Sequence, residues 1–263
     1  MLSDIQRKIA PLLAKNRSAE TYFAGGAVLN ARTWRVSEDL DIFTDTDEII
    51  PDIVQRDIAA LKQAGFQVII DLEIYGCTEA TVRQDGGETQ IQWMSETSSR
   101  FFPLEADPDW GLRLHMTDLA VNKALAASTR RQARDALDLA LIADRYCGLG
   151  PLFIGAANKL QKLSPLRLIE QARHRIVTTP LEAFAAVHGR PETITPAIIK
   201  EVGLTALDEA EAFLEAAPDE WLDGIAVDTE GVPVGRNDQA AEIRQLSDGG
   251  GRFPSFPGLD FAP

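Results

Sequence analysis

The spacing of apolar residues predicts helices in the first 112 residues. Apolar residues recur at helical intervals over residues 3–13, where Ser3 can cap the helix and Pro11 would kink or split it. The same spacing returns over residues 49–64 and ends before a glycine. This second helix has one apolar face, so we expect it to pack on a sheet.

Apolar or alternating runs supply the strands of that sheet. They cover residues 22–24, 40–44, 66–74, 79–84 and 89–94. The last two runs are joined by Asp85-Gly86-Gly87, which is a strong hairpin turn signal. A short helix is predicted over residues 28–33, between the double glycine Gly25-Gly26 and the second strand.

Beyond residue 112 the pattern becomes helical. Thr117 can cap a helix that runs through Leu125, and another helix follows Ser128-Thr129. From Gly224 onward the helical period is lost and Gly, Pro and Asp become frequent, which is typical of a poorly packed tail. Further helical spacing is found over residues 152–176, 197–202 and 206–216.

Together these patterns predict an α+β fold in three parts. A small mixed β-sheet with flanking helices covers residues 1–112, a helical domain covers residues 113–223, and an irregular C-terminal tail covers residues 224–263. A chain of 263 residues with 45% hydrophobic content can bury a full core without covalent staples. Cys77 and Cys147 lie far apart in sequence, which favours reduced thiols over a disulfide.

Apolar runs and net charge limit where the protein can be located and what it can bind. No apolar run approaches the roughly 18 to 20 residues of a membrane span, and the N-terminus has no signal-peptide pattern. We therefore expect a soluble, cytoplasmic protein with no membrane partner. The net charge of −14 argues against indiscriminate nucleic-acid binding. Residues 123–175 alone carry a net charge of +6, so a local basic surface for a polyanion such as RNA and ordinary solvated helix faces are both open.

Candidate chemistry is concentrated between Tyr22 and Phe43. If residues 40–44 form a strand, Asp39 and Asp41 point to one face of the sheet. Two carboxylates on one face need a cation, and such oxygen ligands suit Mg²⁺ that also binds phosphate, so a metal-bound nucleoside triphosphate is the expected ligand. Gly25 and Gly26 allow backbone N–H groups to approach phosphate, and Ser37 can add a hydroxyl.

These residues resemble the signature of the DNA polymerase β-like nucleotidyltransferases, a glycine-rich turn followed by Asp-x-Asp on a strand. The wording is more similar to the AbiEii/AbiGii toxin family, which has Gly-Gly-Thr-Ala-Leu and then Arg-x-Ser-x-Asp-Leu-Asp-Ile-Phe. The chain has Gly25-Gly26-Ala27-Val28-Leu29 and then Arg35-Val36-Ser37-Glu38-Asp39-Leu40-Asp41-Ile42-Phe43. A buried strand with a polar rim after a glycine turn is the plainer interpretation of the same residues.

A second stretch is similar to another signature of the same family, a Lys on one helix followed by Arg-Asp-x-x-Asp on the next. Here Lys123 precedes Arg134-Asp135-Ala136-Leu137-Asp138. Asp135 and Asp138 are three residues apart and so are neighbours on one helical face. Simple surface ion pairs, Arg131 with Asp135 and Arg134 with Asp138, are the alternative.

The resemblance implies a metal-dependent transfer of a nucleotide from an NTP to an acceptor hydroxyl, with release of pyrophosphate. It implies an acceptor that is the 3′ end of tRNA or a protein hydroxyl, and a separately encoded antitoxin as partner. The implied roles are Mg²⁺ or Mn²⁺ binding by Asp39 and Asp41, phosphate binding by Gly25, Gly26 and Ser37, phosphate neutralisation by Lys123, and orientation of Lys123 or base catalysis by Asp135 or Asp138.

The superfamily commonly places a third acidic residue on a later strand, and the chain departs from this pattern. The matching triplet is Ile91-Gln92-Trp93, and Gln92 is neither a charged ligand nor a base. Either another acid such as Glu88 or Glu73 supplies the third ligand, or catalysis relies on two carboxylates together with residues downstream. Two other functions stay open: a small-molecule nucleotidyltransferase of the aminoglycoside-modifying type, and a non-catalytic nucleotide-binding or partner-binding module.

Overall fold

A computed structural model describes residues 1–96, 99–235 and 238–247, and the chain forms two compact units. The sheet unit consists of Leu2–Val28 and Ser37–Leu114, and the helical unit consists of Met1, Leu29–Val36 and His115–Ser247. The sequence predicted a continuous first part, residues 1–112. The structure instead assigns Leu29–Val36, which precedes the aspartate strand, to the helical unit.

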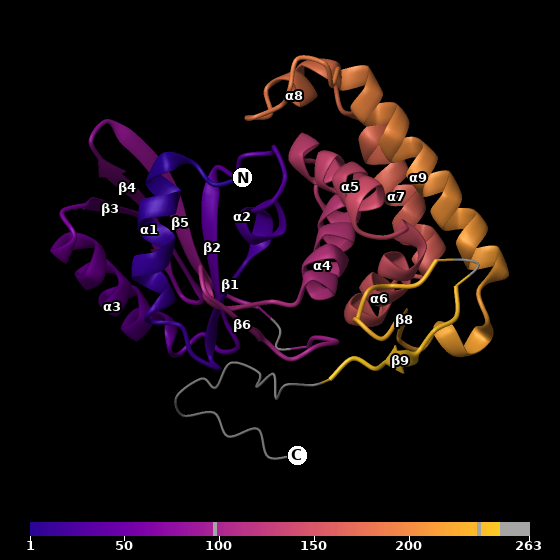
Figure 1. Ribbon diagram of the computed structural model, residues 1–263, viewed down its shortest axis with the longest axis horizontal. Helices are drawn as coiled ribbons and strands as arrows, with labels where there is room; N and C mark the ends of the chain where they lie inside the picture. Colours follow the sequence, from indigo (N-terminus) through magenta and orange to yellow (C-terminus); the bar gives the residue numbers. More distant parts are fainter. Residues whose placement is uncertain (97–98, 236–237, 248–263) are drawn as a thin grey trace. The chain divides into compact units, whose positions relative to one another are not determined.

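The sheet unit confirms the predicted mixed sheet with flanking helices (Figure 1). Within the described residues its seven strands run in the order β3-β4-β5-β2-β1-β7-β6. β2 pairs antiparallel with β1 and parallel with β5, so the sheet is mixed. The elements up to residue 114 are α1 (Asp4–Ala14), β1 (Thr21–Ala24), α2 (Gly25–Leu29), β2 (Asp39–Thr44), α3 (Ile50–Gln63), β3 (Gln67–Ile74), β4 (Cys77–Gln84), β5 (Gly87–Ser95), β6 (Glu105–Asp107) and β7 (Gly111–Arg113).

One face of this sheet is the core. Leu40 and Ile42 of β2 are fully buried, and the register places them beside Ile91 and Trp93 of β5. α1 contacts β5, and α3 contacts β3, β4 and β5, so both helices cover this face (Figure 1). The apolar face predicted for the second helix therefore packs on the sheet, as expected.

A buried ion pair connects the core face to α3. Arg17 Nη2 lies 2.6 Å from Asp57 Oδ2, and neither side chain is exposed to solvent. The same carboxylate accepts hydrogen bonds from Trp93 Nε1 at 2.8 Å and Asn16 Nδ2 at 2.8 Å. Because all these donors converge on one buried carboxylate, Asp57 holds the end of α1 and β5 against α3.

Local signals explain most elements of the sheet unit, with two differences. The hairpin between β4 and β5 has Asp85 at φ 51° and Gly86 at φ 79°, the positive angles that the predicted turn requires. Pro11 lies inside a continuous α1, so of the two expected effects, a kink or a split, the split is absent. The short helix predicted over residues 28–33 is instead Gly25–Leu29, because Thr33 Oγ1 folds back onto Asn30 in a turn.

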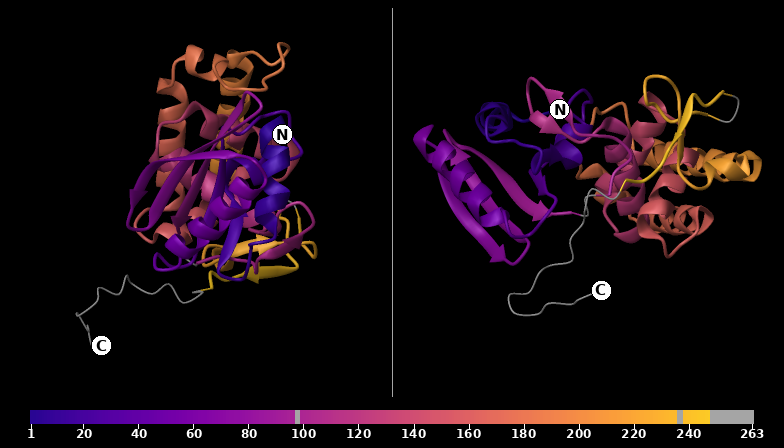
Figure 2. Two further views of the ribbon diagram at one scale, coloured as in Figure 1. Left: turned by 90° about the vertical axis from the view of Figure 1, so that its left-hand side faces the viewer. Right: turned by 90° about the horizontal axis from the view of Figure 1, so that it is seen from below.

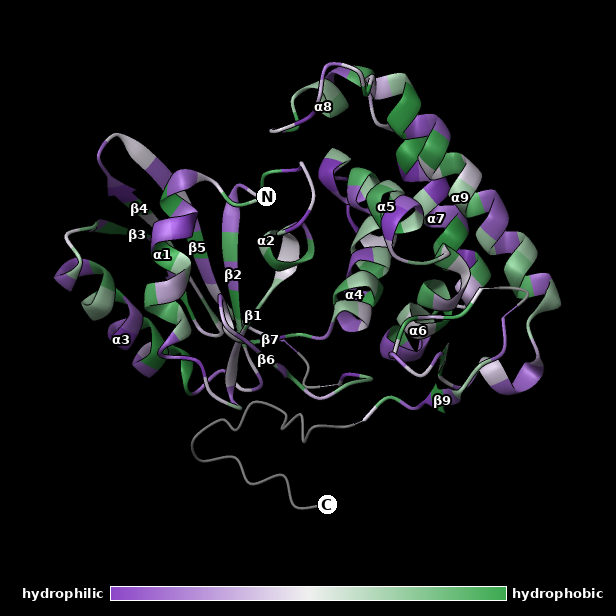
Figure 3. Cartoon of the chain, in the orientation of Figure 1, coloured by the Kyte–Doolittle hydropathy of each residue, from purple (hydrophilic) through white to green (hydrophobic). Residues whose placement is uncertain are grey.

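The helical unit is built around α4, whose N-terminus is capped by His115 rather than by the predicted Thr117. His115 Nδ1 accepts a hydrogen bond from the Thr117 backbone N–H at 3.1 Å. α7 and α9 lie side by side (Figures 1 and 2), and hydrophobic and hydrophilic residues alternate along α9 (Figure 3). The helices are α4 (Met116–Thr129), α5 (Ala133–Arg145), α6 (Leu149–Leu160), α7 (Pro165–Thr178), α8 (Leu181–Ala185), α9 (Pro196–Ala216) and the 3-10 helix η1 (Asp219–Trp221).

Part of the predicted irregular tail is ordered. β8 (Ile225–Val227) pairs antiparallel with β9 (Glu242–Arg244), and all three residues of β8 are buried. Apolar residues in β8 and its contact with α6 explain why this stretch packs. The last part of the predicted tail, residues 248–263, lies outside the described residues. No helix in the described part of the chain is both long and apolar enough to span a membrane.

We predict that Asp57→Ala lowers the free energy of unfolding of the sheet unit by roughly 3–5 kcal/mol, because it leaves the buried Arg17 guanidinium without its counter-charge. Urea titration of both proteins measures this change. Glu88→Ala is the control, since it removes the exposed partner of Arg83 and is expected to cost under about 1 kcal/mol. Equal effects of the two substitutions would contradict the prediction.

Candidate active site

The two aspartates of β2 share the sheet face opposite to the core. Asp39 is paired in register with Gln90 of β5 and Asp41 with Gln92. Because side chains alternate along a strand, the burial of Leu40 and Ile42 directs both carboxylates to the other face. The geometry predicted for Asp39 and Asp41 is therefore present within the sheet unit.

The position of the Asp41 side chain requires a glycine at position 25. Its backbone has φ +68°, a conformation that side chains with a Cβ rarely adopt. A Cβ at this position would lie 1.7 Å from Asp41 Oδ2, so the carboxylate packs directly against the glycine backbone. Gly25 begins α2 and precedes Gly26, and the two glycines therefore adjoin the aspartate pair.

Ser37 is hydrogen-bonded to the same pair. Its hydroxyl donates to Asp39 Oδ1 at 2.9 Å, and both side chains are buried. Gln6 of α1 fixes the Ser37 backbone, because its Nε2 donates to Ser37 O and to Thr89 Oγ1, both at 3.0 Å. Sequence reasoning missed Gln6. Its side chain takes part in the capping box of α1 and also makes this buried contact.

The register confirms the placement of Gln92 and identifies an acid that sequence reasoning missed. Gln92 lies between Asp41 on β2 and Glu79 on β4, all on one face. Glu79 accepts a hydrogen bond from Gln92 Nε2 at 3.2 Å. Glu73 pairs with a residue of the core face, so it points away from the aspartates. Glu88 is on the aspartate face but is ion-paired with Arg83.

The donor set of Asp39 and Asp41 fits a divalent metal that is bound together with a substrate. Mg²⁺ commonly takes one or two protein carboxylates and completes its shell with phosphate oxygens and water. Among the described residues no group of three or more His, Cys, Asp or Glu side chains is placed to hold a metal. Two carboxylates without a third ligand therefore suit a metal that arrives with a nucleotide rather than a permanently bound ion.

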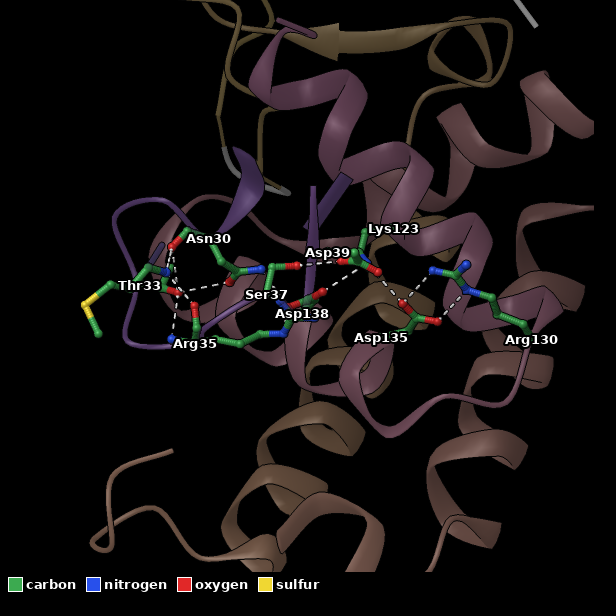
Figure 4. Close-up of polar contacts among 10 residues, drawn as sticks. Asn30, Thr33, Arg35, Ser37, Asp39, Lys123, Arg130, Asp135 and Asp138 are labelled. Atoms are coloured by element: carbon green, nitrogen blue, oxygen red, sulfur yellow. Dashed lines mark hydrogen bonds and ion pairs between the residues drawn. The ribbon is translucent and has the colours of Figure 1, made fainter. Parts of the chain in front are cut away.

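In the helical unit, the second predicted group of residues forms one buried cluster (Figure 4). Lys123 Nζ of α4 lies 3.0 Å from Asp135 Oδ1 and 3.0 Å from Asp138 Oδ2, both on α5. The side chains of the two aspartates are fully buried. Asp135 also pairs with Arg130 Nε at 2.8 Å. Because both aspartates are buried, they do not form the simple surface ion pairs of the alternative interpretation.

Arg35 and Asn30 join this cluster, and sequence reasoning gave neither a role. Arg35 Nε lies 3.0 Å from Asp138 Oδ1, and Asn30 Nδ2 donates to the same oxygen at 2.9 Å. Both belong to Leu29–Val36, which explains why this segment is part of the helical unit. Arg35 of the first signature thus pairs with Asp138 of the second. The signal that could have indicated this pair is that the family's first signature also begins with an arginine.

Charge pairing shifts the titration of this cluster. Burial alone would lower the pKa of Lys123, but the Asp138 and Asp135 carboxylates outweigh it and raise the pKa above its ordinary value. Burial would raise the pKa of Asp135, and the cations Lys123 and Arg130 overcome this and lower it. The ammonium and the carboxylate are therefore both charged near neutral pH.

Much of the positive charge in residues 123–175 is compensated inside the helical unit. Besides Lys123 and Arg130, Lys159 lies 3.3 Å from the buried Asp118, and Arg173 pairs with Asp208 and Glu211. A cation that is held by a carboxylate attracts a polyanion less than an unpaired one. The charge count of this block therefore overstates its attraction for RNA.

The sheet and helices have the fold of the nucleotidyltransferases. The structure is similar to that of MenT4, a nucleotidyltransferase toxin from Mycobacterium tuberculosis H37Rv, with a TM-score of 0.58 and 15% identity over 83% of this chain and 85% of that chain. It is also similar to JHP933 from Helicobacter pylori, with a TM-score of 0.48 and 17% identity over 82% and 97% of the two chains. No family model and no curated protein matches the sequence. The predicted resemblance is confirmed at the level of the fold.

We predict that the ion pairs of Asp135 make the free energy of unfolding depend on pH in the acidic range. A carboxyl whose pKa falls below 3.8 on folding contributes stability above that pH and loses it as the pH falls through the folded value. Asp135→Asn should therefore lower the free energy of unfolding at pH 7 and flatten its decline between about pH 5 and pH 2. Urea unfolding across this range measures both. Asp144→Asn, at an exposed site, is the control, and parallel curves for wild type and Asp135→Asn would contradict the assignment.

Proposed function

We propose that the chain is a metal-dependent nucleotidyltransferase that transfers a nucleotide from an NTP to an acceptor hydroxyl and releases pyrophosphate. The observation that carries the proposal is the pair Asp39 and Asp41 on one sheet face, with the Gly25 backbone packed against Asp41. The nucleotidyltransferase fold, similar to that of MenT4, supports it.

In this proposal Asp39 and Asp41 hold Mg²⁺ or Mn²⁺. The bound metal would neutralise phosphate charge and lower the pKa of the acceptor hydroxyl. Ser37 has a single hydroxyl proton, which now goes to Asp39. It can donate that proton to a phosphate oxygen only after releasing Asp39, so metal binding by Asp39 and phosphate binding by Ser37 favour each other.

Gly25 and Gly26 are proposed to bind the β- and γ-phosphates through the backbone, where a side chain would block the approach. The expected neutralisation of phosphate by Lys123 stays a prediction. Of the two roles expected for Asp135 and Asp138, the orientation of Lys123 is better supported than base catalysis. Both carboxylates are fully buried and each lies 3.0 Å from the Lys123 ammonium.

We further propose that the protein acts in the cytoplasm as the toxin of a toxin–antitoxin or phage-defence system, with a separately encoded antitoxin as partner. The similarity to a nucleotidyltransferase toxin supports this role. The proposed acceptor is the 3′ end of tRNA or a protein hydroxyl. A small-molecule acceptor is the second candidate, because the internal pairing of Lys159 and Arg173 removes part of the electrostatic argument for RNA.

Labelled nucleotide identifies the acceptor. The protein is incubated with Mg²⁺ and each of the four labelled triphosphates, together with whole-cell RNA, protein and metabolite fractions. We expect metal-dependent label in the RNA or protein fraction, and label confined to small molecules would favour the second candidate. No incorporation with any triphosphate in any fraction would contradict the transferase assignment.

We predict that Asp39→Asn together with Asp41→Asn abolishes transfer and leaves the thermal unfolding temperature close to that of wild type. Asparagine keeps the shape and can still accept from Ser37, but the charge that binds the metal is lost. Asp52→Asn, at an exposed position of α3, is the charge-matched control. A double variant that keeps most of the wild-type transfer rate would contradict the metal assignment.

A further inference from the structure

The face of the sheet that carries Asp39 and Asp41 extends across two more strands. Along one row of the sheet, Asp41 on β2 is followed by Gln92 on β5 and Glu79 on β4. Adjacent strands are about 4.8 Å apart, so the backbones of Asp41 and Glu79 are separated by about 10 Å. One carboxylate thus lies on each side of the neutral Gln92.

Glu79 is held in a fixed orientation by the glutamines of β5. Gln92 Nε2 donates to Glu79 Oε1 at 3.2 Å, and Gln90 Nε2 donates to Glu79 Oε2 at 3.4 Å. An ionised carboxylate offers about four acceptor positions, and these two bonds use two of them. The side chain is half-buried, and no cation is among these partners. The carboxylate is therefore positioned without being neutralised by them.

Transfer to a hydroxyl releases a proton that some group must accept. Gln92 cannot accept it, because an amide is not a base at neutral pH. In the proposed function Asp39 and Asp41 are metal ligands, which makes them poor bases. Of the other acids considered, Glu73 is on the core face and Glu88 is paired with Arg83.

We propose that Glu79 is the proton acceptor for the attacking hydroxyl, and this inference rests on the proposed function. As the acceptor oxygen forms its bond to the α-phosphorus, its O–H bond breaks and the proton moves to a carboxylate oxygen of Glu79. The bond from the α-phosphorus to the bridging oxygen breaks, and pyrophosphate leaves with that electron pair. The acceptor then binds over Gln92, between the metal site and Glu79, and the two glutamines orient the base.

The competing explanation is that Glu79 only connects β4 to β5. Three variants separate the two explanations. Glu79→Gln removes the base but keeps an amide that can bond to Gln92. Glu79→Gln with Gln92→Glu keeps a Glu–Gln hydrogen bond across the same two strands, with the carboxylate moved one strand closer to Asp41. Glu73→Gln is the matched control, because it removes the same group from the other face.

The experiment measures kcat and KM of labelled transfer, the pH–rate profile, Mg²⁺-dependent NTP binding without acceptor, and thermal unfolding. We expect Glu79→Gln to lower kcat by about 10²–10⁴-fold and to remove the acidic limb of the profile, with NTP binding unchanged. We expect the exchanged pair to recover at least about one factor of ten of this loss, since a carboxylate again adjoins the acceptor. Glu73→Gln should behave as wild type.

A wild-type kcat and pH profile in Glu79→Gln would overturn the inference and leave the proposed function intact. If Glu79→Gln fails to fold, the exchanged pair decides alone. An acidic limb that is shifted or lost supports the base, and a wild-type kcat with an unshifted acidic limb overturns it. Failure of the proposed function gives a different result, because the wild-type protein would then incorporate no label from any triphosphate.

Discussion

Asp39 and Asp41 face the same side of the sheet only because Leu40 and Ile42 are buried on the other. A slip of one residue along β2 would exchange the two sets and place carboxylates in the core, at a cost of several kcal/mol for each buried charge. The burial of Leu40 and Ile42 beside Ile91 and Trp93 of β5 therefore fixes the register of the polar face. Every assignment on that face, including Gln92 and Glu79, depends on this alternation.

The helical unit holds its carboxylates in a different way, because it buries them together with cations. Asp135 and Asp138 have no solvent exposure, and three cations surround them: Lys123, Arg130 and Arg35. Removing one member of such a group leaves an uncompensated charge in a low-dielectric interior, which is why buried ion pairs are sensitive to single substitutions. Leu29–Val36 is attached to this unit through the same charges. A segment between two elements of the sheet unit is thus held by the second signature.

Much of the fold could be predicted from the sequence, because strand alternation, helical spacing and the Asp85-Gly86 turn are local signals. The placement of Asp39 and Asp41 on one face of the sheet was equally local. The grouping of Lys123 with Asp135 and Asp138 followed from the family resemblance. What the sequence could not give was contact between distant residues. The ion pair of Arg35 with Asp138 and the hydrogen bond of Gln92 with Glu79 depend on tertiary register. β8 was missed because three residues are too few to show a period.

The close contact between Gly25 and Asp41 changes how the effect of a substitution at Gly25 should be interpreted. In sequence this glycine resembles a phosphate-binding residue, and a loss of function after its replacement would ordinarily be assigned to the phosphate. Any side chain there would first displace the Asp41 carboxylate, which lies 1.7 Å from the position of a Cβ. In a mutational scan, substitutions at Gly25 and at Asp41 would therefore have coupled effects, and a relative without Gly25 would be expected to differ at the Asp41 position as well.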